Sequence, residues 1–477
     1  MTSFFSLRRR KRTIFHDMEL DYPSIFEHLA IFGGSGSGKS SFLLVAAIAA
    51  FRLGGERLGC LWAAVKSEEK EAFFRVMKEA GALDRVIHLV PGSFAYNFLA
   101  WELMRKGGSY ATAMELLVDM NRLTLRNGGG EGSDQFWENL FKMLGESAIL
   151  LCWLARREKV TIEDVYNLVV SVPSSFDQAA SEKFREQSFC WQMIEQAGRN
   201  LQSESERREY QQATNFVWKE LVSLGSKAKG AAQSNLVSLL RMFLRSPIYE
   251  SVCCQTNSFT PEMALSGHCV LMDAPVKVYG PVGVMLQNLI VGQTTTVGLQ
   301  RHNPDYDTII MRDEAPELIG SPHTEISNLA LARSARISFW TLCQSIPNLQ
   351  VAFGNHAESG MLAYLTNHAI RVVLSTGCVK TAQFFSQFYG EVIEQMVSVS
   401  ERQPEQEFNL LNTMLGDDGL SFSCSSQYRP RISPSDIFSL RRGGKVNRLC
   451  VDFLHSQAGR TYGPNASPVK FVTFKQI

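Results

Sequence analysis

The segment Gly33–Ser40, with the sequence GGSGSGKS, constrains the fold of this chain more than any other feature. It follows the short apolar run His28–Phe32 and precedes an apolar stretch that predicts a helix over Lys39–Phe51. A glycine-rich turn between a strand and a helix is the setting of the phosphate-binding loop, G-x-x-x-x-G-K-S/T. Its glycines let consecutive backbone N–H groups point at phosphate oxygens, and the start of the helix adds positive potential. The sequence therefore predicts an α/β fold that binds a nucleoside triphosphate.

The same loop assigns roles to single residues. Lys39 is expected to contact the β- and γ-phosphates of ATP, and the Ser40 hydroxyl to bind Mg2+. A glycine-rich turn without a ligand is the alternative, which the flanking strand and helix disfavour. The residues expected to cradle the nucleotide are Gly33, Gly34, Ser35, Gly36, Ser37, Gly38, Lys39, Ser40 and Ser41.

A pair of carboxylates follows the apolar strand expected over Thr308–Met311. In a chain with a phosphate-binding loop, Asp313 is expected to hold Mg2+ through its water shell, and Glu314 to polarise the attacking water. An acidic pair after a strand can also serve only as the cap of the next helix. Together with Lys39, the pair predicts that ATP is hydrolysed as well as bound.

Three polar residues flank the next expected strand, Ile337–Cys343. Gln344 ends this strand, where it could sense the γ-phosphate or order water, although a glutamine there is often only a loop residue. Arg333 and Arg336 precede the strand. In ring ATPases such an arginine can reach the nucleotide of a neighbouring subunit, but most surface arginines have no such role.

Hydrophobic patterns divide the rest of the chain into two kinds of segment. Apolar runs alternate with helical stretches at the start and again after Gly267, which predicts a parallel sheet covered on both faces. Residues 98–263 show helical periodicity, including a helix that starts at Thr161 with Asp164 in its first turn. The other expected strands are Cys60–Val65, Val86–Val90, His268–Asp273, His368–Leu374 and Leu449–Leu454.

The predicted fold class is therefore α/β, a RecA-like P-loop NTPase with a mostly parallel central sheet and an inserted all-α domain. A basic N-terminal tail is expected over residues 1–26. The ATPase domain is discontinuous, over 27–97 and 264–477, and the inserted domain covers 98–263.

Composition limits the function further. The chain has 48 Lys+Arg and 47 Asp+Glu residues, so a surface that binds a polyanion must be local. Its 10 cysteines show no zinc-type spacing, which favours buried thiols in a reducing cytosol.

The basic run Arg8–Arg12 has no apolar stretch behind it and is not a signal peptide. We interpret it as a solvated tail, or as a contact for DNA or an anionic membrane. No segment approaches the roughly 20 apolar residues of a membrane helix, so a soluble protein is expected.

With these residues placed, most of Glu27–Asp436 resembles the type IV coupling proteins of the TraG/TraD group, within the HerA/FtsK superfamily of ring-shaped DNA-pumping ATPases. The resemblance rests on an ordered set of motifs in addition to the phosphate-binding loop. These motifs are Ala228–Arg245, Gly267–Leu271, Asp313–Leu318, Thr341–Ser345 and Thr381–Gly390.

The resemblance implies Lys39 and Ser40 on nucleotide and metal, Glu314 as the catalytic carboxylate and Gln344 as a sensor. Arg333 lies eleven residues before Gln344, where the family places its arginine finger, and Arg336 is the reserve. A homo-hexamer with this arginine acting in trans is therefore expected.

Two departures from the family stand out. Many members carry N-terminal transmembrane helices, which this sequence lacks, so a cytoplasmic protein is expected, with peripheral association at the inner membrane left open. The second strand also lacks the family's usual Asp-Pro-Lys ending, since Ala64-Val65-Lys66 keeps only the lysine.

Three functions follow. The first is an ATP-driven translocase that feeds DNA, single- or double-stranded, and relaxase to a type IV secretion or conjugation apparatus, with relaxosome or secretion-apparatus proteins as partners. Basic residues of the helical domain could touch DNA phosphates or form only a solvated helix face: Lys227, Lys229, Arg241 and Arg245. The second is a soluble HerA-like ATPase that acts with a nuclease in DNA repair or phage defence. The third is a nucleotide-gated scaffold of a secretion apparatus with negligible turnover.

Overall fold

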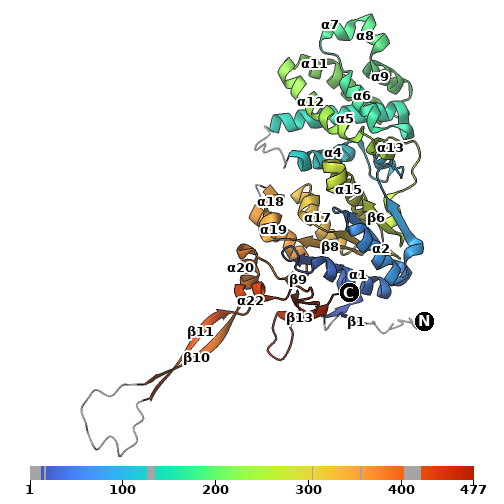
Figure 1. Cartoon of the computed structure of the whole chain (residues 1–477). Helices are drawn as coiled ribbons and strands as arrows, with labels where there is room; N and C mark the ends of the chain where they lie inside the picture. The colour runs from blue at the N-terminus through green and yellow to red at the C-terminus, as the bar shows by residue number, and fades with distance from the viewer. Residues whose placement is uncertain are drawn as a thin grey trace, which may run out of the picture.

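The centre of the computed structural model is a nine-stranded, mostly parallel sheet (Figure 1). The structure describes residues 12–15, 18–125, 135–302, 304–354, 357–401 and 420–476. The strand order is β13-β12-β9-β3-β8-β7-β4-β6-β5. Neighbours from β9 to β5 pair in parallel, whereas β12 pairs antiparallel with both β9 and β13. The strands are β3 (Leu29–Phe32), β4 (Leu58–Ala64), β5 (Val86–Leu89), β6 (Cys269–Asp273), β7 (Asp307–Arg312), β8 (Ile337–Cys343), β9 (Ile370–Leu374), β12 (Cys450–Gln457) and β13 (Val469–Lys475).

Two hydrophobic cores cover the two faces of this sheet. Along β3, Leu29 and Ile31 belong to the core under helices α1 (Lys39–Gly54) and α2 (Glu69–Ala80). Ala30 and Phe32 belong to the other core, because successive side chains of a strand point to opposite faces. The helices of that second face are α15 (Val276–Leu299), α16 (Ala315–Leu318), α17 (Pro322–Ala332), α18 (Ile346–Phe353), α19 (Ala357–Asn367), α20 (Val379–Phe388) and α22 (Pro434–Ser439).

The described residues between β5 and β6 contain helices and no strand, which agrees with the helical periodicity of the sequence. Thr161 and Asp164 form the expected capping box at the start of α6. These helices stand above the sheet in Figure 1, with α4 beside α15. They are α3 (Phe98–Met104), α4 (Tyr110–Leu125), α5 (Gln135–Arg156), α6 (Ile162–Val170), α7 (Phe176–Ala180), α8 (Glu182–Gln187), α9 (Phe189–Arg199), α10 (Glu204–Asn215), α11 (Leu221–Ser223), α12 (Ser226–Phe243), α13 (Ile248–Val252) and α14 (Pro261–Ala264), with a π-helix at Phe216–Glu220.

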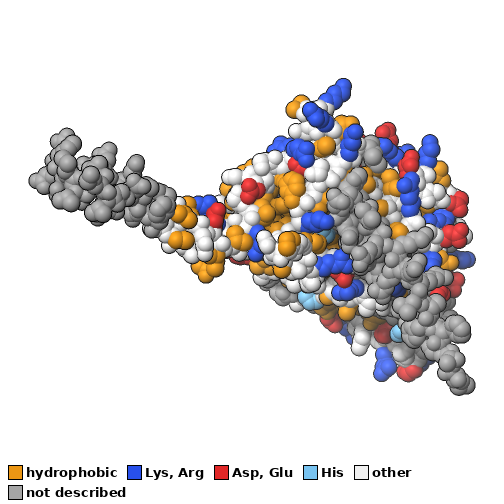
Figure 2. Space-filling model, turned by 90° about the horizontal axis from the view of Figure 1, so that it is seen from below, with side chains coloured by type: hydrophobic (Ala, Val, Ile, Leu, Met, Phe, Trp, Pro, Cys, Tyr) orange, Lys and Arg blue, Asp and Glu red, His pale blue; other side chains and the backbone are white. Residues whose placement is uncertain are grey.

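A long antiparallel ribbon, here called the arm, projects from the sheet domain beside α20 and α22 (Figure 1). It consists of β10 (Glu391–Glu401) and β11 (Leu420–Pro430). Ile393 lies opposite Tyr428, and Val397 opposite Cys424, so these side chains share one face of the ribbon. All four are exposed, and Figure 2 shows hydrophobic side chains along the described part of the arm.

The structure adds strands that the sequence did not predict. The arm, the helix α22 and the edge strand β13 are all missing from the expected elements, because the Pro-, Ser- and Arg-rich stretch before Leu449 is typical of a loop. Within the region expected to be a tail, β1 (Arg12–Phe15) and β2 (Met18–Asp21) form a short hairpin, followed by a 3₁₀ helix at Tyr22–Phe26.

Most of the basic run, residues 8–11, lies outside the described residues. The same holds for the glycine-rich stretch 127–132, which the sequence predicts to be a loop. Among the helices that the structure does describe, none combines the length and apolarity that crossing a membrane requires.

Candidate functional site

The phosphate-binding loop leaves the carboxyl end of β3, in the middle of the sheet. Gly33 N–H donates to the Cys343 carbonyl at the end of β8 (3.2 Å), and Gly34 N–H to the Ser375 carbonyl just after β9 (2.9 Å). The loop is thus tied to both strands that flank β3. Gly36 and Gly38 have φ of 69° and 98°, which other residues adopt only with strain.

Two side chains of the loop, Ser37 and Lys39, are buried. The Lys39 ammonium donates to the carbonyl oxygens of Gly33 (2.6 Å) and Gly34 (3.0 Å). Burial lowers the pKa of Lys39, against the opposing charges of Glu314 and Asp313. The Ser37 hydroxyl is buried and has no hydrogen-bond partner among the described residues. These groups form a cradle that suits a polyanion, because a phosphate would replace weak backbone acceptors with charged ones.

The two predicted carboxylates lie beside this cradle, at the end of β7. Asp313 is 3% exposed, and within the described structure its Oδ1 has no hydrogen-bond donor. Burial raises its pKa, as does the charge of Glu314, while Lys66 and Lys39 act in the opposite direction. A buried carboxylate oxygen without a donor, next to a phosphate-binding loop, fits a bound cation such as Mg2+.

Glu314 is held from two sides. Its Oε1 accepts hydrogen bonds from the Lys66 ammonium (2.6 Å) and from Gln344 Nε2 (2.7 Å). Its backbone adopts the left-handed region, with φ of 62°, a strained conformation for a residue other than glycine. Glu314 and Gln344, predicted separately from the sequence, are therefore in direct contact.

In the sequence, Lys66 is notable only as the one residue that this chain keeps of the family's Asp-Pro-Lys ending. In the structure its ammonium lies 3.8 Å from Asp313 Oδ2 as well as contacting Glu314. Burial lowers the pKa of Lys66, but the hydrogen bond to Glu314 and the charge of Asp313 outweigh this, so the pKa is raised. The sequence analysis did not predict this pairing. Its only signal is topological: β4 neighbours β7, so the turns after the two strands must adjoin.

Arg333 lies at the opposite edge of the sheet. It precedes the amino end of β8, and its guanidinium pairs with Glu27 (3.1 Å), just before β3. Its side chain is 64% exposed. Because the phosphate-binding loop is at the carboxyl edge, Arg333 does not join the cluster of Lys39, Asp313, Glu314 and Gln344 within one chain.

The other two arginines of this region have structural partners. Arg336 forms a bidentate pair with Asp307, so its guanidinium is engaged within the chain. Arg312, an unexpected charge in a buried strand, donates to both carboxylate oxygens of Glu325 (2.9 and 2.8 Å). Burial of this pair accounts for the arginine in the strand.

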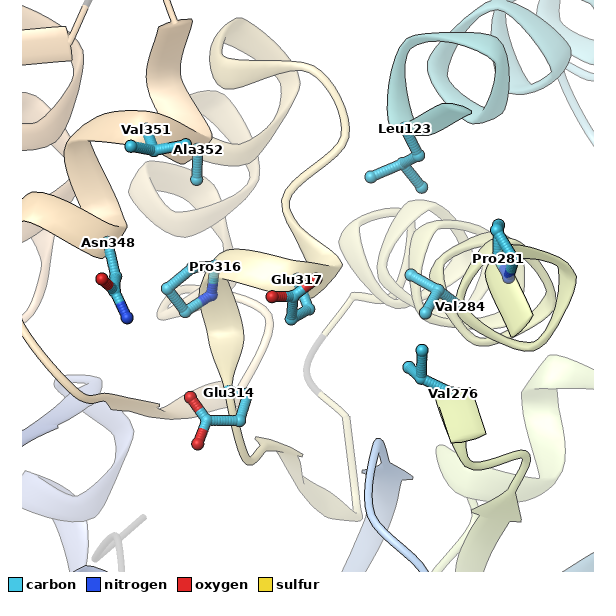
Figure 3. A pocket seen from close by; sticks show the side chains of 10 residues that line it. All are labelled: Leu123, Val276, Pro281, Val284, Glu314, Pro316, Glu317, Asn348, Val351 and Ala352. Carbon is cyan, nitrogen blue, oxygen red and sulfur yellow. The ribbon is translucent and has the colours of Figure 1, made fainter. Parts of the chain in front are cut away.

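A hollow of about 370 Å³ adjoins the carboxylates. In Figure 3 the Glu314 carboxylate lies at one end of it, with Pro316 and Glu317 of α16 beside it. Leu123 of α4 and Val284 of α15 form the far wall. The site therefore opens towards the helical insertion.

One of the four basic residues considered for DNA contact is not available for it. Lys229 is buried, 7% exposed, and its ammonium donates to the Pro173 carbonyl, so it belongs neither to a DNA-contacting surface nor to a solvated helix face. Burial lowers its pKa. Lys227, Arg241 and Arg245 are exposed on or just after α12.

Comparison with known proteins agrees with this architecture. The family model described as the TraM recognition site of TraD and TraG matches residues 308–442, from β7 through the arm. The unbound form of the bacterial conjugative coupling protein TrwBdeltaN70 is 15% identical, with a TM-score of 0.60, over 98% of this chain and 90% of that chain. The resemblance to type IV coupling proteins is confirmed.

Two further structures of the plasmid coupling protein TrwB have the same fold. One, in complex with ADP and Mg2+, is 16% identical with a TM-score of 0.58, over 98% of this chain and 89% of that chain. The other, in complex with the GTP analogue GDPNP, is 15% identical with the same TM-score and coverage. These coupling-protein structures confirm the predicted fold class, a P-loop α/β sheet with an inserted helical region. No curated protein sequence matches the chain.

Proposed function

We propose that this chain is an ATPase of the coupling-protein type, which hydrolyses ATP with Mg2+ and uses the energy to move DNA as a ring. The observation that carries the proposal is the convergence of Lys39, Asp313, Glu314 and Gln344 at the carboxyl edge of one sheet. Lys39 ends the loop that follows β3, Asp313 and Glu314 follow β7, and Gln344 follows β8. Phosphoryl transfer needs this combination of phosphate cradle, metal-binding carboxylate and water-activating group.

In this proposal each side chain has a separate role. Lys39 moves from its backbone acceptors to the phosphates, and residues 33–41 wrap them. Ser40 and Asp313 hold Mg2+, which neutralises charge on the phosphates. Glu314 accepts a proton from the attacking water, and Gln344 couples that carboxylate to the carboxyl end of β8.

The position of Arg333 supports assembly into a ring. An exposed arginine at the amino edge of the sheet can serve only the nucleotide of another subunit. We propose that it acts in trans, with a homo-hexamer as the simplest closed arrangement. Its pairing with Glu27 would hold the guanidinium outward until the neighbour's nucleotide arrives.

DNA is the proposed cargo, and relaxosome or secretion-apparatus proteins are the proposed partners. The match of residues 308–442 to a TraM recognition family supports a coupling role over a nuclease-linked repair or defence ATPase. Exposed Lys227, Arg241 and Arg245 are the remaining candidates for phosphate contact on or just after α12.

The test is ATP turnover by the purified chain, alone and with single- or double-stranded DNA at low salt, where phosphate contacts are strongest. Turnover that DNA stimulates, and that Glu314→Gln reduces by at least roughly 100-fold, is expected. Native mass measurement with an ATP analogue should show a closed oligomer, and Arg333→Ala should lose turnover without losing binding. ATP binding with no measurable turnover would replace this proposal with a nucleotide-gated scaffold.

A further inference from the structure

Lys66 lies in the short turn between β4 and α2, and this turn is fixed from both sides. The Glu69 carboxylate accepts the backbone N–H groups of Val65 (3.0 Å) and Lys66 (2.8 Å) through Oε1, and Trp62 Nε1 (3.1 Å) through Oε2. Glu69 is itself 5% exposed. On the other side, Val276 N–H donates to the Val65 carbonyl (3.1 Å).

Such a turn orders the base of the lysine side chain before any ligand arrives. Lysine carries high side-chain entropy, and an exposed lysine pair contributes little for that reason. Here the backbone is anchored, Asp313 and Glu314 are buried, and the Lys66 ammonium lies between them at 3.8 and 2.6 Å. The contact is therefore built into the site and differs from an incidental surface pair.

The contact also makes the two carboxylate oxygens of Glu314 unequal, because only one of them accepts these hydrogen bonds. Lys66 and Gln344 both donate to Oε1. Within the described part of the chain, Oε2 is consequently the oxygen that can receive a proton from water. Lys39, the other ammonium of the site, donates to loop carbonyls instead.

We infer that Lys66 is a positioning residue for ATP hydrolysis, which fixes the Glu314 carboxylate with Oε2 facing the attacking water and offsets the charge of the Asp313–Glu314 pair. This inference rests on the proposed ATPase function. Glu69 acts indirectly, because it fixes the turn from which the Lys66 side chain extends. Neither residue needs to touch the nucleotide.

The experiment compares Lys66→Met, Lys66→Gln and Lys66→Arg with the wild type in steady-state ATP turnover and in binding of a fluorescent ATP analogue. A matched control is Lys70→Met, which removes a lysine of α2 that pairs instead with Asp273 (3.4 Å). Loss of the positioning contact should reduce kcat of Lys66→Met by roughly 10- to 100-fold with KM and analogue binding nearly unchanged. Lys66→Arg should recover most of the rate, Lys66→Gln less, and Lys70→Met should behave as wild type.

A second measurement separates positioning from a general effect on the fold. In a Glu314→Gln background, Lys66→Met should cause no further loss, because the group that it positions is already disabled. Equal kcat in wild type and Lys66→Met, or a parallel loss of analogue binding, would overturn the inference while leaving the ATPase proposal intact. A wild-type chain that binds the analogue but shows no turnover would overturn both. If Lys66→Met does not fold, Lys66→Gln and Lys66→Arg carry the same comparison.

Discussion

At the scale of single residues, the phosphate-binding loop is closely packed at one glycine and open at another. A Cβ added to Gly38 would lie 2.9 Å from Cγ1 of Val451 in β12, whereas one added to Gly36 would meet nothing within 4 Å. Both glycines have positive φ, so both substitutions to alanine carry backbone strain. A substitution at Gly38 therefore also tests the contact between the loop and the antiparallel edge of the sheet, whereas one at Gly36 does not.

We predict that Gly38→Ala destabilises the protein by about 1–3 kcal/mol more than Gly36→Ala, because overpacking adds to the strain. Urea denaturation of the two variants measures the difference. In the double variant with Val451→Ala, most of the extra loss should be recovered. A Gly38→Ala that is no less stable than Gly36→Ala would show that β12 does not press on the loop.

Burial of histidines predicts sensitivity to acid. Burial lowers the pKa of His28 to about 4 and those of His368 and His455 to about 3, so each is neutral in the folded protein. The unfolded chain takes up protons first as the pH falls below the ordinary histidine value, and folding then loses stability until the folded-state pKa is reached. Neither ring nitrogen of His455 has a partner in the described structure, so this histidine can be replaced without breaking a hydrogen bond.

We predict that His455→Leu keeps its stability at pH 7 and loses roughly 2 kcal/mol less than the wild type between pH 7 and pH 5. Thermal or urea unfolding at the two pH values measures this. If variant and wild type lose equal stability between pH 7 and pH 5, protonation of another group must cause that loss.

The sequence predicts the residues of the site better than their pairing. Lys39, Asp313 and Glu314 are recognisable because a phosphate-binding loop and a strand with terminal carboxylates are local patterns. The Lys66–Glu314 contact joins residues 248 positions apart, and no local pattern encodes it. Lys229 is an example of a local pattern that misleads. Its position on a helix suggests an exposed charge, but its ammonium donates to the carbonyl of Pro173, which lies in another segment of the chain.

At the scale of elements, the arm is the part of the structure that depends least on the rest. Residues 391–398 and 423–430 of the arm are exposed except for the partly buried Val392. Its two strands start and end side by side, since Glu391 lies opposite Pro430 and the Arg431 N–H donates to the Gly390 carbonyl (2.9 Å). A short loop can therefore replace the arm without moving its ends.

We predict that replacing residues 391–430 by a short glycine-serine turn changes the melting temperature by less than about 2 °C, because little surface is buried there. Circular dichroism melting and basal ATP turnover measure the outcome. A large drop in melting temperature would mean that the arm packs on the body. The same variant, tested for oligomerisation and DNA stimulation, separates assembly from catalysis.

The strands with continuous apolar runs were predictable, and the arm and β13 were not. Buried parallel strands such as β3 and β4 contain no polar side chain, which is a strong signal. The arm and β13 instead mix apolar and polar residues, so neither forms a continuous apolar run. The stretch around β11 also contains many serines, which favours the interpretation as a loop.

At the scale of the whole molecule, the helical insertion and the sheet share one core. A single hydrophobic cluster runs from Phe32 of the sheet through Met285 of α15 to Leu144 and Leu151 of α5. A buried polar contact crosses the same boundary, since Gln293 Nε2 of α15 donates to Glu102 of α3 (3.1 Å). The insertion is therefore separate in sequence but continuous in packing.

We predict that the protein unfolds in one calorimetric transition, and that an isolated fragment 98–263 shows no cooperative melting, because its face towards α15 would be exposed. Two well-resolved transitions, or a fragment with a sharp melt of its own, would contradict this. Shared packing also gives the nucleotide site a direct mechanical connection to the helices that stand above it.

The position of β3 has a consequence for synthesis on the ribosome. Among the strands that the structure describes, β3 pairs only with β8 and β9, which follow after the entire helical insertion has been made. At roughly 5–20 residues per second, about 300 residues separate β3 from its first partner by some 15–60 seconds of elongation. During that interval the apolar strand that leads into the nucleotide loop has no partner to pair with. We therefore expect nascent chains stalled before β8 to be captured by chaperones, and chains released after β9 to escape them.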